Sequence, residues 1–271
     1  MFKMATPILG RPLYQRDASI HRLMTKIISC QSIQSITEAE RSLFKSSDDT
    51  DHVITTEETI FHPQGGGQPS DIGQMKSEQT DLLFNVKLVR KTPENQIYHL
   101  GSFADATTPF QKGDSIVQNI DTVQRNYHSR YHTAGHILGL AVKQLRPQVG
   151  EVSEIKANHA PGMAFVEFRG LIGGEHKGII QERATELVKR NLAVTVDWWN
   201  EEKAKSHCVA LPEGFSVPDE GDIRVVDVEG AGAYPCGGTH LPGTCDIGGI
   251  VVRRISRQKG VTKISYEITD V

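Results

Sequence analysis

The sequence lacks any long hydrophobic run, and nothing in its 271 residues resembles a membrane span. Its first residues, MFKMATPILGRPLYQRD, place one basic residue before a short apolar stretch broken by proline, which is too weak for a secretory signal peptide. We therefore expect a cytoplasmic protein with no membrane partner. The hydrophobic fraction of 38% and the charged fraction of 23% are those of a globular chain, long enough for one large domain or two modest ones.

Cysteine and positive charge are also scarce. The four cysteines, Cys30, Cys208, Cys236 and Cys245, are widely scattered, which argues against a disulfide framework and favours metal binding or reduced thiols. The net charge is -3, whereas a protein that holds nucleic acid mainly through phosphate contacts should be basic overall. We expect no DNA partner, and any RNA partner must be met by a local basic patch.

Internal repeats are absent, and the apolar pattern divides the chain into two regions. Over residues 1–119 the apolar segments are short and strand-like with Gly, Pro, Asn and Asp between them, which predicts a small, mostly antiparallel β-barrel. Within it, residues 35–47 are predicted to form a short helix or a mobile insertion. Over residues 120–271 a long helix, begun by the capping pair Asp121 and Gln124, is followed by strands and further helices, which predicts an α+β domain with helices on an antiparallel sheet.

A pair of histidines lies within the long helical segment. His132 and His136 in HTAGH are four residues apart, so on a helix both rings leave the same face, which suits two ligands of one metal ion. Thr133 stands where the zinc protease motif HExxH has its glutamate. Taken alone, this spacing is more typical of ordinary surface or core histidines.

A second pair of donors stands in AYPCGGTHLPGT. Cys236 and His240 repeat the four-residue spacing, but the two glycines between them make a helix improbable, so a tight turn presents a thiolate and an imidazole. Three histidines and one cysteine match tetrahedral zinc, and we expect one ion per chain. The alternative is a buried cysteine beside a glycine turn, which the presence of both pairs disfavours.

Three motifs together resemble those of a known family. FHPQGGGQPSD at residues 61–71, then HTAGH, then CGGTH, in this order and at these separations, resemble the alanyl-tRNA editing (AlaX) family, free-standing proteins similar to the editing domain of alanyl-tRNA synthetase. LYQRDASIHRLMTKI is similar to the family's opening strand region, and TCDIGGIVVRRISRQKGVTKISYEI to its closing hairpin. The resemblance covers nearly the whole chain except residues 31–50, and we expect no aminoacylation domain.

The resemblance implies hydrolysis in trans of mischarged tRNA, chiefly serine attached to the alanine tRNA, with glycine as a further candidate. A synthetase pocket for alanine cannot exclude glycine by size and rejects an added hydroxyl poorly. A second site can instead bind that hydroxyl, and correctly charged alanine then leaves the polar group of the site unpaired and is spared.

The glycine loop has a role in this expectation. The resemblance places the backbone of Gly65, Gly66 and Gly67 against the aminoacylated adenosine, and it makes the Thr59 hydroxyl the candidate for reading the serine side chain, with Gln68 next. We count Thr59, Gln68 and the two HTAGH histidines as catalytic candidates. The alternative for Thr59 is an ordinary strand residue. A phosphate-binding loop is the other interpretation of a glycine run, but no GK[ST] follows.

The chain departs from the family pattern at three positions. His62 stands where tyrosine is usual, Gln64 where glutamate is usual, and Cys245 where glycine is usual. A neutral amide at position 64 would weaken any role of a carboxylate there. Cys245 could be a spare ligand, an oxidisable thiol or a residue without a role, since isolated cysteines are usually buried hydrophobes.

The state of the metal ligands bears on the mechanism. If all four donors bind zinc at once the site is closed, whereas a catalytic zinc needs an open position, so one donor must be displaced or bind weakly. An open zinc ion would polarise the ester carbonyl and lower the pKa of water, with an outer histidine or carboxylate moving protons. His128, one turn before His132, is a possible outer partner or a plain surface residue.

The closing hairpin carries the basic residues Arg253, Arg254, Arg257, Lys259 and Lys263. Strand alternation would place Arg253 and Arg257 on one face, where they could follow the acceptor stem of the tRNA; the alternative is a solvated edge.

Two other functions stay open. One is editing of mischarged threonine tRNA, because the editing domain of threonyl-tRNA synthetase is similar in its HxxxH and CxxxH half but lacks a GGGQ loop. The other is a zinc-binding interaction module that has lost the reaction. Protein partners stay open.

Overall fold

A computed structural model describes residues 12–105, 108–209 and 221–270. The first eleven residues, which carry most of the argument against a signal peptide, lie outside these ranges. The chain divides into two compact units, Met1–Gln64 with Ser70–Arg125, and Gly65–Pro69 with Asn126–Val271. The sequence places the boundary slightly earlier, after residue 119. The tip of the glycine loop groups with the second unit although its flanks belong to the first.

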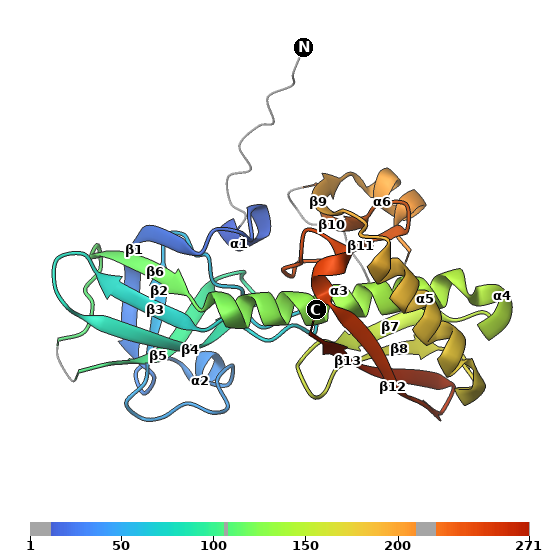
Figure 1. The fold of residues 1–271 in the computed structure, drawn as a ribbon. Coiled ribbons are helices and arrows are strands. Elements are labelled where there is room, and N and C mark those ends of the chain that lie inside the picture. The colour runs from blue at the N-terminus through green and yellow to red at the C-terminus, as the bar shows by residue number, and fades with distance from the viewer. Residues whose placement is uncertain (1–11, 106–107, 210–220, 271) are drawn as a thin grey trace, which may run out of the picture. The chain divides into compact units, whose positions relative to one another are not determined.

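The first unit is a closed antiparallel barrel of six strands (Figure 1). The strands are β1 (Arg22–Ser32), β2 (His52–Thr56), β3 (Gly73–Ser77), β4 (Leu83–Lys91), β5 (Ile97–Phe103) and β6 (Ser115–Ile120). They pair in the order β1-β2-β5-β4-β3-β6. Phe61, Phe84, Met75 and Ile116 are fully buried in the barrel core, and closure leaves no unpaired strand edge. The predicted small antiparallel barrel is confirmed.

Two short helices accompany the barrel, α1 (Leu13–Arg16) and α2 (Glu38–Arg41). Helix α2 begins at a capping box in which Thr37 Oγ1 accepts from the Glu40 amide at 3.3 Å and Glu40 Oε2 accepts from the Thr37 amide at 2.9 Å. The Tyr98 hydroxyl donates to Glu40 Oε1 at 2.6 Å, and Phe44 packs in a small apolar cluster with Tyr98. Residues 35–47 therefore contain the short helix, the first of the two predicted alternatives.

A buried ion pair between Asp71 and Arg125 holds the segment that follows the glycine loop. Arg125 Nε donates to both carboxylate oxygens of Asp71 at 2.9 and 3.0 Å, and its Nη2 donates to the carbonyl of Ile60 at 2.6 Å. The Asp71 carboxylate also accepts from the His62 amide at 2.6 Å. These bonds satisfy a charge pair that is almost wholly removed from water, and they hold both flanks of the loop.

The second unit has two antiparallel sheets. The first, in the order β12-β13-β8-β7, consists of β7 (Ser153–Asn158), β8 (Phe165–Arg169), β12 (Gly249–Gln258) and β13 (Val261–Thr269). The second, in the order β11-β10-β9, consists of β9 (Val194–Trp199), β10 (Ile223–Val228) and β11 (Gly232–Pro235). The helical segments are α3 (Thr122–Gln144), α4 (Arg146–Val149), η1 (Gly174–His176), α5 (Lys177–Lys189), α6 (Glu201–His207) and η2 (Thr244–Ile247).

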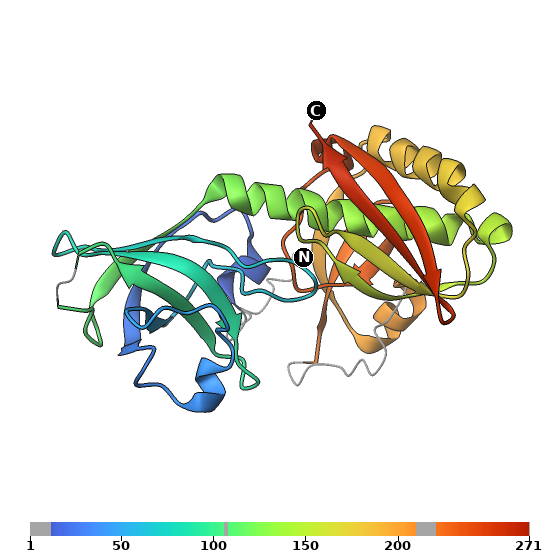
Figure 2. The same cartoon turned by 90° about the horizontal axis from the view of Figure 1, so that it is seen from below.

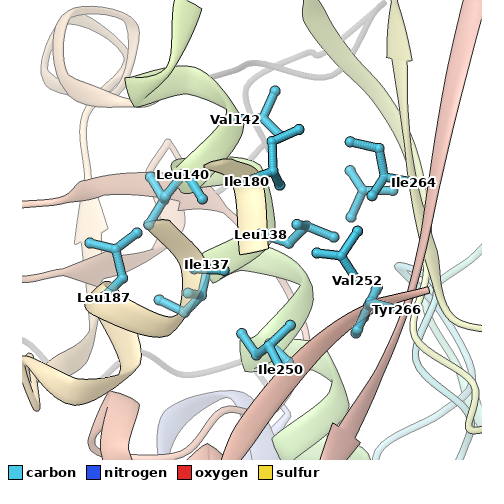
Figure 3. Close-up of a cluster of buried hydrophobic side chains, with 14 of the residues drawn as sticks. Ile137, Leu138, Leu140, Val142, Ile180, Leu187, Ile250, Val252, Ile264 and Tyr266 are labelled. Atoms are coloured by element: carbon cyan, nitrogen blue, oxygen red, sulfur yellow. The ribbon is translucent and has the colours of Figure 1, made fainter. Parts of the chain in front are cut away.

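Helix α3 carries the core of this unit. It begins after Asp121, whose Oδ1 accepts from the Gln124 amide at 2.9 Å as the predicted cap requires. Residues 131–142 are all buried, so this stretch of the helix is covered on every side, its polar His132, Thr133 and His136 included. Its Ile137, Leu138 and Leu140 belong to one apolar cluster with residues of α5 and of both sheets. Figure 3 shows them with side chains of α5, β12 and β13, and α5 lies beside β12 (Figure 2). None of the helices in the described ranges is long and apolar enough to cross a membrane.

Candidate metal centre

The two histidines of HTAGH lie on the buried stretch of α3. His132 is 1% exposed and His136 is 7% exposed, and their ring centroids are 5.0 Å apart. One helical turn separates them, so both rings leave the same face as the sequence predicts. The burial excludes surface histidines, one half of the alternative for this spacing, and leaves ordinary core histidines as the other half.

Cys236 and His240 belong to the turn that follows β11. Cys236 Sγ lies 3.4 Å from His132 Nε2 and 3.3 Å from His240 Nε2. One donor atom from each of the four predicted ligands lies within 4.8 Å of the others. The structure therefore brings together the whole donor set that the sequence assigns to a metal.

The donor set fits zinc on chemical grounds. One thiol and three imidazoles are the borderline-soft ligands that suit Zn²⁺ in a tetrahedral site. His136 Nδ1 is buried and finds no hydrogen-bond partner among the described residues, which is costly for a polar atom unless a ligand engages the ring. Burial is also the main cause that lowers the pKa of His136 to about 3, followed by the charges of His159 and Arg224, so this ring is a neutral donor.

Gln68 fixes the tautomer of His132. The Thr239 amide can only donate, and it points at Gln68 Oε1 at 3.0 Å, which identifies this atom as the amide oxygen. The same oxygen lies 2.7 Å from His132 Nδ1, so Nδ1 carries the proton and donates it. His132 Nε2 therefore keeps its lone pair on the side of Cys236 Sγ, as a metal ligand must.

Further bonds hold the Gln68 side chain in place. Its Nε2 donates to Thr239 Oγ1 at 2.8 Å, and Thr239 Oγ1 lies 2.7 Å from Ser129 Oγ. Gln68 and Thr239 are fully buried. A Cβ at Gly238 would lie 2.7 Å from Gln68 Oε1 and would collide with the His132 ring, so the second glycine of CGGTH leaves the room that this contact needs.

Thr133 stands at the position of the glutamate in HExxH and contacts His240 much as Gln68 contacts His132. Its Oγ1 accepts from the Leu241 amide at 3.1 Å and lies 3.2 Å from His240 Nδ1. With Nδ1–H of His240 donating to that oxygen, Nε2 is left to face Cys236. Sequence reasoning named Thr133 only for the motif that it breaks.

Burial is the largest cause that raises the pKa of the Cys236 thiol, while Arg224 and the Gly238 amide lower it. The Gly238 N–H donates to Sγ at 3.4 Å, and Arg224 donates to the carbonyl oxygen of Cys236. A thiol buried in this way favours its protonated form unless a cation compensates the thiolate.

The glycine triplet makes a tight turn. The Gly65 amide donates to the Gln68 carbonyl at 3.1 Å, and the Gln68 amide returns the bond at 2.9 Å. Gly66 and Gly67 between them have φ of 56° and 81°, as the two central residues of a type I′ turn require. A Cβ at Gly67 would lie 2.7 Å from the carbonyl oxygen of Ala157, whereas one at Gly66 would meet nothing within 4 Å.

His159 is a further member of the cluster that sequence reasoning missed. Its ring stacks on His132 with centroids 4.3 Å apart, its Nδ1 lies 2.7 Å from the Tyr266 hydroxyl, and its amide donates to the Gly67 carbonyl at 2.8 Å. A Cβ at Gly135 would collide with this ring, so a glycine in the middle of α3 makes room for it. Burial lowers the pKa of His159 to about 3.

The comparisons with known proteins agree with these motifs. The family described as the threonyl and alanyl tRNA synthetase second additional domain matches residues 223–265. Alanyl-tRNA editing protein AlaX-M of Methanosarcina barkeri is 28% identical over 240 residues, which cover 86% of this chain and 95% of that protein. The resemblance to the alanyl-tRNA editing family is confirmed.

Alanine–tRNA ligases are similar to the chain as well. The ligase of Haloquadratum walsbyi is 30% identical over 226 residues, or 82% of this chain and 23% of the ligase. The ligase of Methanosphaera stadtmanae is 29% identical over 228 residues, or 80% of this chain and 24% of the ligase. The chain thus spans about a quarter of the length of these ligases.

The departures from the alanyl-tRNA editing pattern lie in different surroundings. The His62 side chain is buried in the barrel unit, edge-on to Tyr14 at 5.3 Å between ring centroids, while Gln64 is exposed. Cys245 is exposed, its Sγ 3.6 Å from Asp246 Oδ1, and it is not part of the four-donor cluster. His128 is buried on α3 and likewise lies outside that cluster.

Thr59, the family candidate for reading serine, lies in the barrel unit and is 6% exposed. Its Oγ1 lies 2.8 Å from His99 Nε2 and accepts from the Phe61 amide at 3.1 Å. His99 Nδ1 donates to the Ile54 carbonyl at 2.9 Å, which leaves Nε2 as the acceptor for the Thr59 hydroxyl. The role of Thr59 in substrate recognition stays a prediction.

The basic residues of the closing hairpin do not simply alternate. A bulge interrupts the pairing of β12 with β13 between Val252 and Arg254, so the alternation argument does not carry from Arg253 to Arg257. Arg253 Nη1 donates to Glu267 Oε1 at 2.9 Å, and Lys263 Nζ lies 3.5 Å from the Phe165 ring centroid. Contact of Arg253 and Arg257 with RNA stays a prediction.

Proposed function

We propose that this protein hydrolyses mischarged aminoacyl-tRNA, chiefly seryl-tRNA(Ala) and also glycyl-tRNA(Ala). The observation that carries the proposal is the buried cluster of His132, His136, Cys236 and His240, in which Gln68 of the GGGQ loop orients a ligand histidine. The similarity to AlaX-M over nearly the full length of both chains supports the alanine tRNA as the substrate. Water attacks the carbonyl carbon of the ester, the bond to the ribose oxygen breaks, and the proton passes to that oxygen as the amino acid leaves.

The residues of the second unit prepare a zinc site. The four donors would hold the ion, which when bound would polarise the ester carbonyl and supply a nucleophile near neutral pH. Gln68 keeps the proton of His132 on Nδ1, and Thr133 Oγ1 lies 3.2 Å from Nδ1 of His240, where it would accept the proton of that nitrogen when Nε2 binds the ion. Among the described residues, no side chain bonds Nδ1 of His136 in the way that Gln68 and Thr133 approach the other two histidines. We therefore expect His136 to be the most easily displaced donor. Its displacement would give the site the open position that catalysis needs.

Recognition of the amino acid is assigned to Thr59 and the glycine loop. Thr59 Oγ1 would bond the serine hydroxyl, and Gly65, Gly66 and Gly67 would offer bare backbone to the terminal adenosine. Correctly charged alanine lacks a hydroxyl and cannot make this bond with Thr59, which disfavours its hydrolysis relative to that of the seryl substrate. Arg253 and Arg257 would contact the phosphates of the acceptor stem.

Editing of threonine tRNA is the second candidate, because the family that matches residues 223–265 is described for both threonyl and alanyl tRNA synthetases. The GGGQ motif and the AlaX-M relative favour alanine. A zinc-binding module without activity is the third candidate, and the arrangement of Gln68 and Thr133 behind two ligands disfavours it.

The deciding experiment is a deacylation assay of the zinc-loaded protein with alanine tRNA carrying serine, glycine or alanine, and with threonine tRNA carrying serine. We expect hydrolysis of seryl- and glycyl-tRNA(Ala), with alanyl-tRNA(Ala) spared. Preferential hydrolysis of seryl-tRNA(Thr) would favour the second candidate, and inactivity of a zinc-loaded preparation on every substrate would favour the third.

Metal binding is tested separately. We expect the purified protein to carry about one zinc per chain, as a site of four protein ligands requires. Cys236→Ala should release most of it, while Cys245→Ala should leave the zinc content unchanged. A folded preparation made without chelator and free of zinc would contradict the metal assignment.

A further inference from the structure

A second cavity lies in the same unit, and none of its lining residues is a ligand of the proposed zinc site. Its volume is about 290 Å³, and it is lined by one face of α3 and α4 (Gly139, Val142, Lys143, Arg146) together with residues of β7, β8 and β11. Strand β7 is the edge of the four-stranded sheet and β11 is the edge of the three-stranded sheet. The size is at the lower end for small-molecule pockets and suits a compact ligand.

An acidic group lines this cavity. Glu154 on β7 accepts from the Tyr234 hydroxyl at 3.1 Å, and it makes no ion pair within the described part of the chain. Burial raises its pKa to about 7, because no positive charge compensates the ionised carboxylate. A Cβ at Gly139 would collide with both Glu154 and Tyr234, so another glycine inside α3 makes room for this pair.

Basic groups line the same cavity from the helix side. Lys143 forms neither a hydrogen bond nor an ion pair with any residue in the described ranges, and burial is the first cause that lowers its pKa, followed by Arg146. Arg146 donates from Nη2 to the Val152 carbonyl at 3.1 Å, while its buried Nε has no hydrogen-bond partner within the part of the chain that the structure describes. Arg146 Nη1 also forms an ion pair with Oε2 of the exposed Glu151, at 3.8 Å.

The cavity thus holds charges of both signs that do not compensate each other. Glu154 and Lys143 line one cavity, yet no ion pair joins them. Neither Glu154 nor Lys143 has an ion-pair partner in the described ranges, so a ligand that offers a cation to the carboxylate and an anion to Lys143 and Arg146 gains both interactions. A simple anion such as phosphate would face the Glu154 carboxylate, and a simple cation would face Lys143 and Arg146.

We propose that this cavity binds a small zwitterion, a free α-amino acid, with its ammonium group at Glu154 and its carboxylate at Lys143 and Arg146. The inference is independent of the proposed reaction, because it needs neither tRNA nor metal. An amino acid of modest size matches the volume of the cavity and the presence of both a carboxylate and basic groups in its lining. The bound ligand would also lie close to Tyr234, whose ring packs on His136 with centroids 4.5 Å apart.

The test is calorimetric titration of the full chain at about pH 8, where the Glu154 carboxyl is ionised. The probes are glycine, L-serine and L-alanine, with ethanolamine as the analogue without a carboxylate and L-lactate as the analogue without an ammonium group. We expect at least one amino acid to bind and both analogues to bind roughly 10-fold more weakly or worse, the scale of one charge-assisted hydrogen bond.

Two variants locate the binding. Glu154→Gln and Lys143→Met should each lower the affinity by about 10-fold or more, whereas Glu182→Gln, at an exposed position of α5, should not change it. Circular dichroism checks that each variant is folded, and the analogue series on the unaltered protein does not depend on any variant. Absence of binding up to about 10 mM, equal binding of lactate, or binding that both variants retain would overturn the proposal.

Discussion

Among single residues, Gln68 carries the most specific expectation. Its side-chain oxygen accepts from His132 Nδ1 at 2.7 Å, and partners of this kind usually contribute 10- to 100-fold to metal affinity. Gln68→Ala should therefore lower zinc affinity by about 10- to 100-fold, measured by competition with a chromophoric chelator. Gln64→Ala is the matched control, because that glutamine is in the same motif but exposed. Equal affinity of the two variants would show that Gln68 acts on substrate rather than on the ligand.

Thr59 gives a prediction for both substrate discrimination and stability, because its hydroxyl already forms hydrogen bonds with His99 and the Phe61 amide in the barrel unit. Thr59→Val removes that hydroxyl, so discrimination between seryl and alanyl substrate should fall by about 2- to 12-fold in the ratio of kcat/KM values. The same change leaves His99 Nε2 and the Phe61 amide without a partner, which should lower the free energy of unfolding by roughly 1 to 3 kcal/mol.

Thr59→Ser keeps the hydroxyl and is the control for both effects. If Thr59→Val costs stability and leaves the kinetic ratio unchanged, the threonine is structural and the serine hydroxyl is recognised by another group.

His99 predicts how the stability of the barrel unit depends on pH. Burial lowers its pKa from 6.5 to about 4, so below pH 6.5 the unfolded chain binds a proton that the folded chain does not. The free energy of unfolding should therefore fall as the pH drops from 6.5 towards 4, by about 3 kcal/mol from this group. Urea denaturation at both ends of this range should show a smaller difference for His99→Gln than for the unaltered protein. An equal difference would mean that other groups cause the acid sensitivity.

At the scale of elements, the glycine turn offers a comparison of adjacent positions. Both Gly66 and Gly67 have positive φ, which asparagine tolerates better than other side chains, but only Gly67 faces a backbone atom. Gly66→Asn should cost less than about 1 kcal/mol of stability, whereas Gly67→Asn should cost roughly 2 kcal/mol or more because its Cβ meets the Ala157 carbonyl. Thermal denaturation of the two variants measures the difference. Equal costs would show that the turn conformation alone requires both glycines.

The same turn bears on the expected contact between the glycine backbone and the adenosine. If the substrate lies against Gly66, Gly66→Val should depress hydrolysis of every substrate with zinc retained. A Cβ at Gly66 meets open space within the structure, so any such effect must come from the substrate itself or from the strained φ of valine.

The parts of the site that could be predicted are those whose residues are close together in the sequence. The ligand pairs were predictable because HxxxH and CxxxH are local spacings, and a helix or a turn converts each of them into a geometry. Gln68, Thr133 and His159 were not assigned their roles, because these depend on contacts between distant segments and on which way a side chain points. The glycines at positions 135 and 238 were the available signal, since each marks a place where another ring needs room.

The fold shows the same division. The barrel and α3 followed from periodicity, whereas β7 has little signal in the sequence, because SEIKAN alternates weakly and is mostly polar. The bulge between Val252 and Arg254 was equally invisible, since nothing in a run of basic and apolar residues indicates an extra residue in one strand. This bulge changes which face of the strand each arginine is on, so Arg253 and Arg257 cannot be placed on one face by alternation alone.

For the molecule as a whole, the connection between the units makes a prediction about fragments. Gly65–Pro69 groups with the second unit, so a fragment of residues 126–271 would hold all four proposed ligands but would lack Gln68. We expect that fragment, if circular dichroism shows it folded, to bind zinc about 10- to 100-fold more weakly than the full chain. The Gln68→Ala variant of the full chain should match it. A fragment with the affinity of the full chain would contradict the assignment of Gln68.

This connection also sets an order of events during synthesis. Gln68 leaves the ribosome roughly 170 residues before His240, which at 5–20 residues per second is about 10 to 35 seconds. For roughly the last 100 residues of that interval, the nascent chain holds the glutamine loop and both helix histidines without the complete cysteine turn. The zinc site can therefore be completed only late in translation, after all strands of the barrel have been made.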